Sequence, residues 1–285
     1  MKNAIEIKDL KKNYSNFKLE IKDLKIPEGV IVGLIGENGA GKTTLIKSIL
    51  NIIKSDYGTI KIFNKNPKKE EQVIKEDIGV VLDNMFFPEI LTAKDIDSIM
   101  KDVFKIWDSE MFFDYLKKLG IPSNKKIKEL SKGMRKKLEI VTALSHKPKL
   151  LILDEPTSGL DPVVRSEVLD IFLDFIKDEN HTILLSTHIT SDLEHIADRI
   201  VFIDNGNIVI DSLKDELIDS YGILKCDLKD FDKISKEDII RYKKNRYEAQ
   251  ILVADRNKIS KKYKDCVIDK ITLEDLMILM IKGVE

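Results

Sequence analysis

A glycine-rich segment that ends in a lysine and two threonines is the group of residues in this chain best suited to chemistry. It reads Gly36-Glu37-Asn38-Gly39-Ala40-Gly41-Lys42-Thr43-Thr44, after an apolar run and before a helical pattern. Glycines let the backbone approach a polyphosphate with its N–H groups turned inward, and the start of the next helix adds a favourable dipole. This strand, loop and helix context is what a phosphate-binding loop requires. The segment therefore predicts a site for a nucleoside triphosphate.

The positions of this loop have different predicted contacts. Lys42 is expected to reach the β- and γ-phosphates, and the Thr43 hydroxyl is expected to bind Mg²⁺. The remaining predicted nucleotide contacts are Gly36, Asn38, Gly39, Ala40, Gly41 and Thr44. The alternative is a glycine-rich turn before a core helix, which the intact spacing and correct flanks disfavour.

Two adjacent carboxylates end a second apolar run. Leu150 to Leu153 is typical of a strand buried on both faces of a parallel sheet, and Asp154 and Glu155 follow directly. Open α/β sheets bind ligands at this edge. Asp154 is suited to the Mg²⁺ shell, while Glu155 points to the other side and can polarise a water in line with the γ-phosphate. A strand that ends in a solvated acidic turn is the alternative.

Three further segments indicate which class of phosphate-loop protein this chain resembles. Leu130-Ser131-Lys132-Gly133-Met134 precedes the acidic strand, Pro156-Thr157-Ser158-Gly159-Leu160-Asp161 follows it, and His188 follows the apolar run Thr182–Thr187. In this order the motifs resemble those of ATP-binding cassette (ABC) ATPases over about residues 1–215. The first segment resembles the family's signature loop, with Lys and Met in place of the second-position Gly and the final Gln.

The resemblance implies an ATPase that works as a dimer. Ser131 is expected to be a helix N-cap, and with Gly133 to form an anion site. In ABC ATPases that site meets the γ-phosphate bound by the opposite subunit, so two chains sandwich two ATP molecules head to tail. The family pattern further implies that Asp161 bridges this interface. It also implies that His188 contacts the γ-phosphate and orients the water near Glu155.

Two further side chains are assigned to the site from their places in the family pattern. Tyr14 lies where the family stacks an aromatic ring on adenine, with Phe17 as the nearby substitute and an ordinary strand-end tyrosine as the alternative. Asp83 stands where the family has a glutamine that touches Mg²⁺. A carboxylate supplies an oxygen ligand on a shorter arm and with a charge, so we expect Asp83 to serve the metal. A residue that only caps the next turn is the alternative.

The motifs and periodicity together predict an α/β fold. Its parts are a P-loop NTPase core with a mainly parallel sheet, an N-terminal antiparallel β subdomain, a helical subdomain carrying the signature loop, and a small C-terminal α+β extension. The expected boundaries are 1–212 for the cassette, with the helical subdomain at about 84–145, and 213–285 for the extension. Ile96, Ile99, Met100 and Val103 show helical spacing, and Asn205-Gly206 predicts a type I′ hairpin. In the extension we expect a helix over 214–221, a strand near 249–253, and a final helix from Thr272 to before Gly283.

Composition limits the kinds of partner. A net charge of −1 gives no footprint for nucleic acid, and 43% apolar with 34% charged residues is typical of a globular protein. No run approaches the roughly 20 apolar residues that span a bilayer, and the N-terminus lacks a signal-peptide pattern. The two distant cysteines suit a reducing cytosol. We therefore expect a cytoplasmic protein that reaches the inner face of the cell membrane only through a partner.

Two functions remain open. The first is the ATPase subunit of a bacterial exporter, working with a second ATPase subunit (a copy or a paralogue) and an integral membrane permease, with peptides, antibiotics or lipids as cargo. The Ser-Lys-Gly-Met signature and Asp83 favour that exporter subgroup. The second is a soluble ABC ATPase that acts in cofactor assembly, translation or repair. A single P-loop, a single signature and the lack of a long heptad run favour the exporter.

Overall fold

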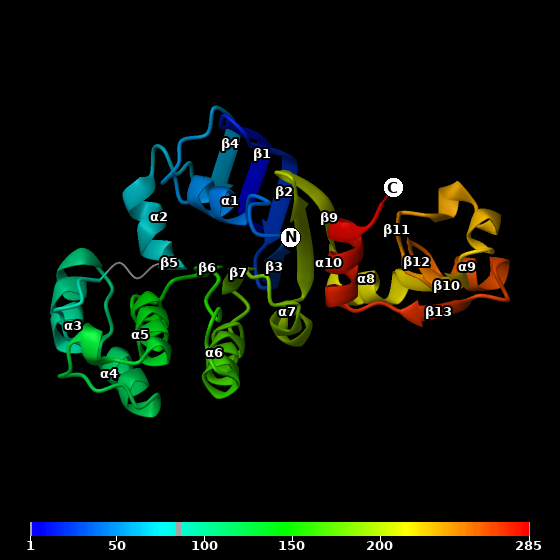
Figure 1. The fold of residues 1–285 in the computed structure, drawn as a ribbon. Helices are drawn as coiled ribbons and strands as arrows, with labels where there is room; N and C mark the ends of the chain where they lie inside the picture. The colour runs from blue at the N-terminus through cyan, green and yellow to red at the C-terminus, as the bar shows by residue number, and fades with distance from the viewer. Residues whose placement is uncertain (1, 84–86, 285) are drawn as a thin grey trace.

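A six-stranded sheet at the centre of the molecule positions the glycine loop and the acidic strand (Figure 1). The structure is a computed structural model, and it describes residues 2–83 and 87–284. The strand order is β5-β6-β7-β3-β8-β9, in which β9 alone runs antiparallel to its neighbour. The strands are β3 (Ile31–Ile35), β5 (Ile78–Val81), β6 (Leu150–Asp154), β7 (Thr182–Ser186), β8 (Arg199–Asp204) and β9 (Asn207–Leu213). Because β3 and β6 are parallel members of one sheet, the segments that follow them lie at the same edge.

The central strands are buried on both faces, as their continuous apolar runs predict. Successive side chains of a strand point to opposite faces. On β6, Leu150 and Ile152 therefore pack in the core beneath the N-terminal sheet, while Leu151 and Leu153 pack in the core beneath the helices α5, α6 and α7. Those helices span Lys132–Leu144, Pro162–Phe175 and Thr190–Ile196. Because β6 is buried on both faces, its position in the sheet fixes where Asp154 and Glu155 leave the sheet.

A three-stranded antiparallel sheet covers the first of these faces (Figure 1). Its order is β2-β1-β4, and its strands are β1 (Asn3–Asn13), β2 (Lys18–Pro27) and β4 (Tyr57–Ile62). Helix α1 (Lys42–Ile49) lies in the same apolar core, through Leu45, Ile46 and Ile49. The predicted N-terminal antiparallel subdomain is confirmed.

The helical subdomain extends away from the sheet on the side of β5 (Figure 1). It consists of α3 (Ala93–Val103), α4 (Ser109–Lys118) and α5, and α2 (Glu71–Asp77) leads into β5. Its own small core contains Ile96, Phe112 and Leu138. The predicted helix around Ile96 is confirmed, but Ile99 and Val103 from the same periodic set are exposed. Residues 84–86 of the predicted segment lie outside the described residues.

The C-terminal extension is a second antiparallel sheet with its own helices. The sheet has the order β11-β12-β10-β13, with β10 (Gly222–Asp227), β11 (Arg241–Lys244), β12 (Glu248–Val253) and β13 (Val267–Lys270). The helices are α8 (Lys214–Ser220), α9 (Arg256–Lys262) and α10 (Leu273–Lys282). The predicted final helix is confirmed, including the Thr272–Asp275 capping box. Only β12 was predicted among the four strands.

Helix α10 packs back on the cassette. Leu273 and Leu276 share an apolar core with Leu193 of α7, and the Leu273 N–H donates to the Glu194 carboxylate at 2.7 Å. The extension therefore covers an apolar face of the cassette.

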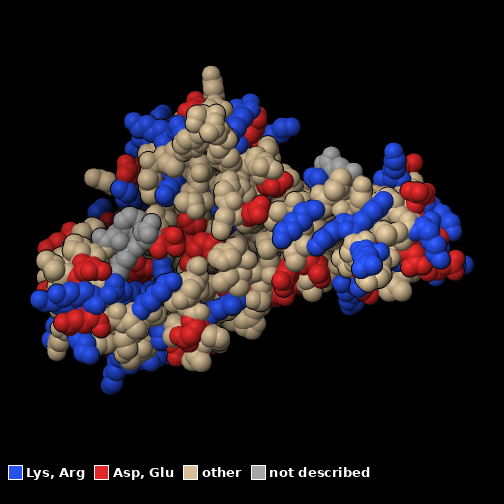
Figure 2. Space-filling view, in the orientation of Figure 1, with Lys and Arg blue, Asp and Glu red and all other residues tan. Residues whose placement is uncertain are grey.

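The predicted hairpin at Asn205-Gly206 is present in the structure. Asn205 and Gly206 both have positive φ, 44° and 77°, as a type I′ turn requires. Figure 2 shows basic and acidic side chains in small alternating groups across the face in view. Every helix in the described part of the chain is too short or too polar to cross a bilayer.

Candidate functional site

The glycine loop encloses a small cavity at the edge of the central sheet. The cavity has a volume of about 250 Å³, and its lining includes Asn38, Gly39, Gly41, Lys42, Thr43 and Thr44 of the loop, together with Phe17, Glu37, Asp83 and Glu155. Gly36 and Ala40 are buried behind it. Gly41 has φ +114°, and a Cβ there would come within 2.9 Å of the Phe17 ring, so only glycine fits this turn. Six of the eight predicted loop residues therefore line one space.

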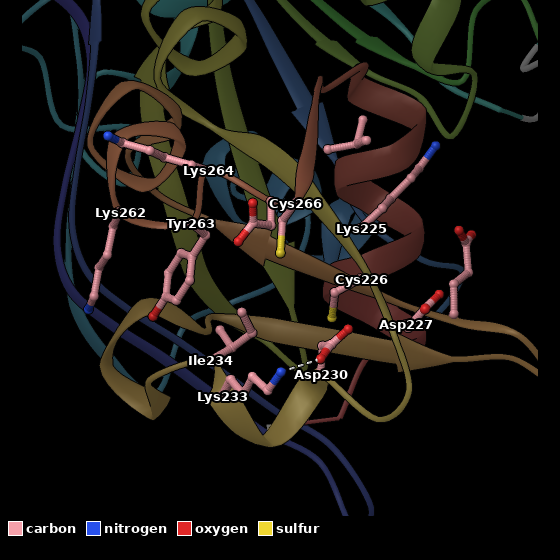
Figure 3. A pocket seen from close by; sticks show the side chains of 13 residues that line it. Lys225, Cys226, Asp227, Asp230, Lys233, Ile234, Lys262, Tyr263, Lys264 and Cys266 are labelled. Carbon is pink, nitrogen blue, oxygen red and sulfur yellow. Dashed lines mark hydrogen bonds and ion pairs between the residues drawn. The ribbon is translucent and has the colours of Figure 1, made fainter.

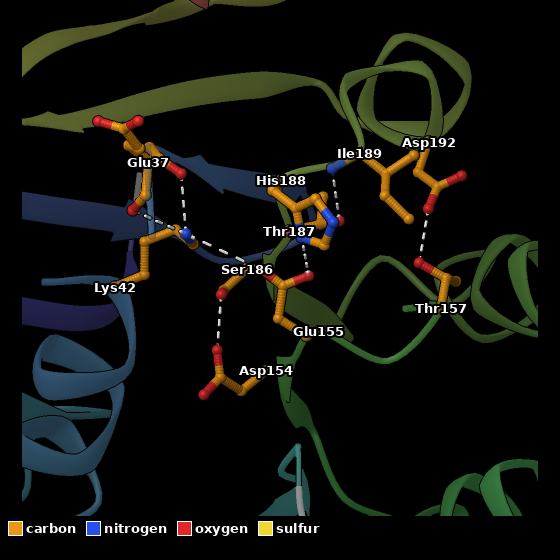
Figure 4. A network of polar contacts seen from close by, with 11 residues as sticks. Glu37, Lys42, Asp154, Glu155, Thr157, Ser186, Thr187, His188, Ile189 and Asp192 are labelled. Atoms are coloured by element: carbon orange, nitrogen blue, oxygen red, sulfur yellow. Dashed lines mark hydrogen bonds and ion pairs between the residues drawn. The ribbon is translucent and has the colours of Figure 1, made fainter. Parts of the chain in front are cut away.

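Lys42 is held inside this cavity by its own loop. Its side chain is buried, and Nζ donates to the carbonyl oxygens of Gly36 at 2.8 Å and Glu37 at 3.3 Å (Figure 4). Nζ also lies 3.8 Å from Oε1 of Glu155. Burial lowers the pKa of the Lys42 ammonium, and the charges of Glu155 and Asp154 oppose this change. A buried cation whose nearest anion is only a carboxylate at 3.8 Å can accept a stronger anionic partner.

Asp154 and Glu155 diverge where β6 ends. Asp154 is 1% exposed, and its Oδ1 accepts a hydrogen bond from the Ser186 hydroxyl of β7 at 2.7 Å. Glu155 has φ +51°, a left-handed conformation that is uncommon outside glycine, and its N–H donates to the Ser186 carbonyl at 2.9 Å. This turn points the Glu155 side chain towards Lys42 and His188 (Figure 4). The predicted divergence of the two carboxylates is present.

His188 is the partner of Glu155. Its Nδ1 lies 2.7 Å from Oε2 of Glu155. A carboxylate can only accept, so Nδ1 carries the hydrogen of this contact. The side chain is 46% exposed and comes from the loop between β7 and α7. The residue therefore orients Glu155 and presents its second nitrogen to an incoming group.

Asp83 faces the same cavity from the end of β5. The preceding carbonyl, that of Leu82, accepts a hydrogen bond from the buried Lys136 ammonium of α5 at 3.2 Å. Lys136 also pairs with Glu139 at 2.8 Å. The two residues of α5 thus fix the backbone that presents Asp83 to the cavity.

The aromatic residue on the cavity wall is Phe17. Tyr14 is 45% exposed, lies 6.3 Å from Phe17 between ring centroids, and is not among the described lining residues. Stacking of adenine on Tyr14 stays a prediction. Phe17, the substitute that the sequence also offered, is the aromatic residue that lines the cavity.

Ser131, Gly133 and Asp161 lie at helix starts outside this cavity's described lining. Ser131 caps α5, as predicted, and its hydroxyl accepts from the Met134 N–H at 3.2 Å. Gly133 packs so closely on α6 that an added Cβ would meet Val164 at 3.1 Å. The Asp161 carboxylate caps α6. These three residues therefore cannot complete the site of their own chain in this arrangement.

One buried network was missed from the sequence. Asp192 of α7 is 1% exposed, accepts from Thr157 at 2.6 Å and pairs with Arg165 of α6. It joins the segment after Glu155 to the helix after His188 (Figure 4). No motif marks Asp192, and only the position of its short helix after His188 offered a signal.

The chain matches a family model described as ABC transporter over residues 19–158. It is 34% identical over 219 residues to the ABC transporter ATP-binding protein YtrB of Bacillus subtilis, covering 75% of each chain. It is 35% identical over 212 residues to the bacitracin transport ATP-binding protein BcrA of Bacillus licheniformis, covering 73% of this chain and 69% of that protein. Among solved structures, an ATP-binding subunit of an ABC transporter superposes with a TM-score of 0.68 at 27% identity, over 75% of this chain and 91% of that one.

Proposed function

The chain belongs to the ABC transporter family of ATP-binding subunits, and from that premise we propose that its ATPase activity powers export through a separate membrane-spanning permease. The observation that carries the proposal is the buried Lys42 ammonium beside Glu155 in one cavity, with Glu155 in turn held by His188. Relatives named for transport of bacitracin and of lantibiotics favour a peptide or antibiotic cargo. The Ser-Lys-Gly-Met signature and Asp83 support our assignment of the chain to that exporter subgroup. We expect it at the inner face of the cell membrane.

In this proposal the residues of the cavity divide the work of hydrolysis. Lys42 and the loop N–H groups bind the phosphates, and Glu155 takes a proton from the attacking water. The Nδ1–H of His188 holds Glu155 in place, and a protonated Nε2 would donate to an oxygen of the γ-phosphate. Thr43, Asp154 and Asp83 offer only oxygen donors, the set that Mg²⁺ prefers. The ion would neutralise charge on the phosphates.

The remaining half of each site comes from a second chain. The first N–H groups of α5 are unpaired within a helix, so Ser131 and Gly133 form an anion site that is separate from this chain's own cavity. A two-fold, head-to-tail pair of cassettes would bring that site against the triphosphate of the partner. Asp161 would lie at the same interface. The partner is a second copy or a paralogue.

Mixing two inactive variants tests this arrangement. Ser131→Arg should bind ATP normally through Lys42 but lose hydrolysis, and Lys42→Ala should lose binding. A mixed dimer contains one site with intact Lys42 and intact Ser131, so mixing should restore up to half of the wild-type rate. The matched controls are Ser131→Arg alone and Lys42→Ala alone, because every dimer in those samples has two broken sites. Full hydrolysis by a strictly monomeric preparation would contradict the proposed dimer.

An apolar groove between β5 and α3 is suited to bind a segment of the permease. It has a volume of about 900 Å³, and its apolar lining includes Val73, Val80, Phe87, Met100, Val103 and Phe104. The strand that forms one wall continues into Leu82 and Asp83, so an occupant of the groove lies one step from the cavity. We assign the groove to a cytoplasmic segment of the permease.

Two exposed valines allow a matched test of this assignment. Val103 is 59% exposed and lines the groove, while Val209 is 43% exposed on β9. Val103→Lys should retain ATP binding and lose co-sedimentation with membranes of the cells that make the protein, whereas Val209→Lys should retain both. Equal co-sedimentation of the two variants would remove the groove from the proposal.

A further inference from the structure

A second cavity lies in the C-terminal sheet and has no part in the proposed ATPase. Its volume is about 650 Å³, and both cysteines of the chain line it (Figure 3). Cys226 is on β10, and Cys266 directly precedes β13. The fold therefore brings together two thiols that are far apart in the sequence.

The strand register places these cysteines opposite each other. β10 and β13 are antiparallel, and their last registered pair is Lys225 with Val267. Continued by one residue beyond the ladder, this register would set Cys226 against Cys266. Directly opposed residues of an antiparallel pair project to the same side, with Cβ atoms about 4.5–5.5 Å apart. A disulfide needs a Cβ separation of about 3.5–4.5 Å, so a small adjustment at the end of the ladder is enough.

We propose that Cys226 and Cys266 form a dithiol site that a low-molecular-weight disulfide oxidises to an intramolecular bond. The Cys266 thiolate attacks one sulfur of the small disulfide, which releases one small thiolate and leaves a mixed disulfide. The Cys226 thiolate then attacks the Cys266 sulfur and releases the second small thiolate. The protein loses two electrons and two thiol protons, and the small disulfide becomes two thiols.

The order of attack follows from exposure. Cys226 is buried at 8% exposure, whereas Cys266 is partly exposed at the cavity wall. An external disulfide can therefore reach Cys266 first, and Cys226 acts on the sulfur beside it. Burial raises the pKa of both thiols, so little thiolate is present and the attack of Cys266 on the small disulfide is slow. The attack of Cys226 on the mixed disulfide is favoured because the two sulfurs are close together.

The bond would act on the connection between the extension and the cassette. It would fasten β10 to β13, and β13 leads directly into α10. Helix α10 contacts α7, the helix that follows His188, through the Leu273–Glu194 hydrogen bond. Cytosolic disulfides are usually transient and redox-sensing, which suits a reversible site of this kind.

Intact-mass measurements with oxidised glutathione as the probe test the proposal. The wild-type chain should lose two hydrogen atoms and carry no lasting adduct. Cys226→Ser should stop at a stable single glutathione adduct, because the second thiol is missing. Cys266→Ser should react at least tenfold more slowly than Cys226→Ser, because its remaining thiol is buried. In denaturant the two variants should react at equal rates, which would attribute the difference to the fold.

Three results would overturn the proposal. They are a lasting adduct on the wild-type chain, disulfide-linked dimers on a non-reducing gel as the main product, and equal reaction rates of the two folded variants. ATP hydrolysis by both serine variants serves as the check that they are folded, since neither cysteine lies at the ATP cavity.

Discussion

Replacing Glu155 by Gln should separate ATP binding from hydrolysis. The amide keeps the size of the side chain and its contact with His188, which is 2.7 Å away in the native pair. It cannot take a proton from water. Loss of a positioned base lowers turnover about 10²- to 10⁴-fold, which is about 3–5 kcal/mol in the activation barrier.

The same change should strengthen ATP binding. Glu155 lies 3.8 Å from the Lys42 ammonium. At an effective dielectric of 20, a pair at that distance attracts by about 4 kcal/mol. The triphosphate competes with this carboxylate for Lys42 and is also repelled by it. Removing the charge ends both effects, so an ATP-bound dimer should accumulate in the presence of Mg²⁺.

The assays are phosphate release for turnover, and nucleotide binding with size-exclusion chromatography for the trapped dimer. Glu37→Gln is the matched control, because it makes the same change at an exposed position on the same cavity wall. We expect less than a tenfold loss of turnover in the control. Near-normal hydrolysis by Glu155→Gln, or an equal loss in the two variants, would refute the assignment of Glu155 as the base.

Two further predictions concern metal and pH. Asp83→Asn should raise the Mg²⁺ concentration needed for half-maximal ATP hydrolysis, and Asp83→Gln, with longer reach, should recover part of the loss. An unchanged Mg²⁺ titration in both variants would show that Asp83 only caps the next turn. The His146 ring is buried against Phe104, and burial lowers the pKa of the imidazole. The imidazole therefore binds a proton more tightly in the unfolded chain than in the folded one. Stability should therefore fall as the pH drops through about 6.5. His146→Phe should flatten that part of the curve in denaturant unfolding, while an identical pH slope would contradict the assignment.

Much of the cassette could be predicted because its elements have local causes. The apolar runs before Gly36 and before Asp154 form buried parallel strands, and these bring the two segments to one edge. Asn205-Gly206 accepts positive φ at both positions, so the hairpin follows from two residues. Ser131 and Thr272 cap helices for the reason that hydroxyl side chains favour that position.

The C-terminal sheet could not be predicted in the same way. β11 reads Arg241-Tyr242-Lys243-Lys244 and β13 reads Val267-Ile268-Asp269-Lys270, which are short and rich in charge. In addition, β13 pairs with β10, whose residues lie up to 48 positions away, as between Gly222 and Lys270. The opposition of Cys226 and Cys266 is a consequence of that register. In the sequence alone, the two cysteines are far apart, which predicts two unrelated thiols.

The helical spacing predicted α3 correctly, but the apolar stripe of this helix is only partly buried. Ile96 faces the small core of the helical subdomain, but Val103 is exposed at the apolar groove. A partner that covers the groove would bury Val103 together with the other apolar side chains that line it.

The groove and the ATP cavity share one short segment of backbone. β5 forms a wall of the groove, and Asp83, two residues beyond its end, lines the cavity. Lys136 holds the intervening Leu82 carbonyl and pairs with Glu139, which also lines the groove. Lys136 belongs to α5, whose first turn carries the signature residues. A displacement of the helical subdomain relative to the sheet must therefore break the Lys136 contact or carry Asp83 with it. That connection gives the chain a physical route by which a partner in the groove and a nucleotide in the cavity can affect each other.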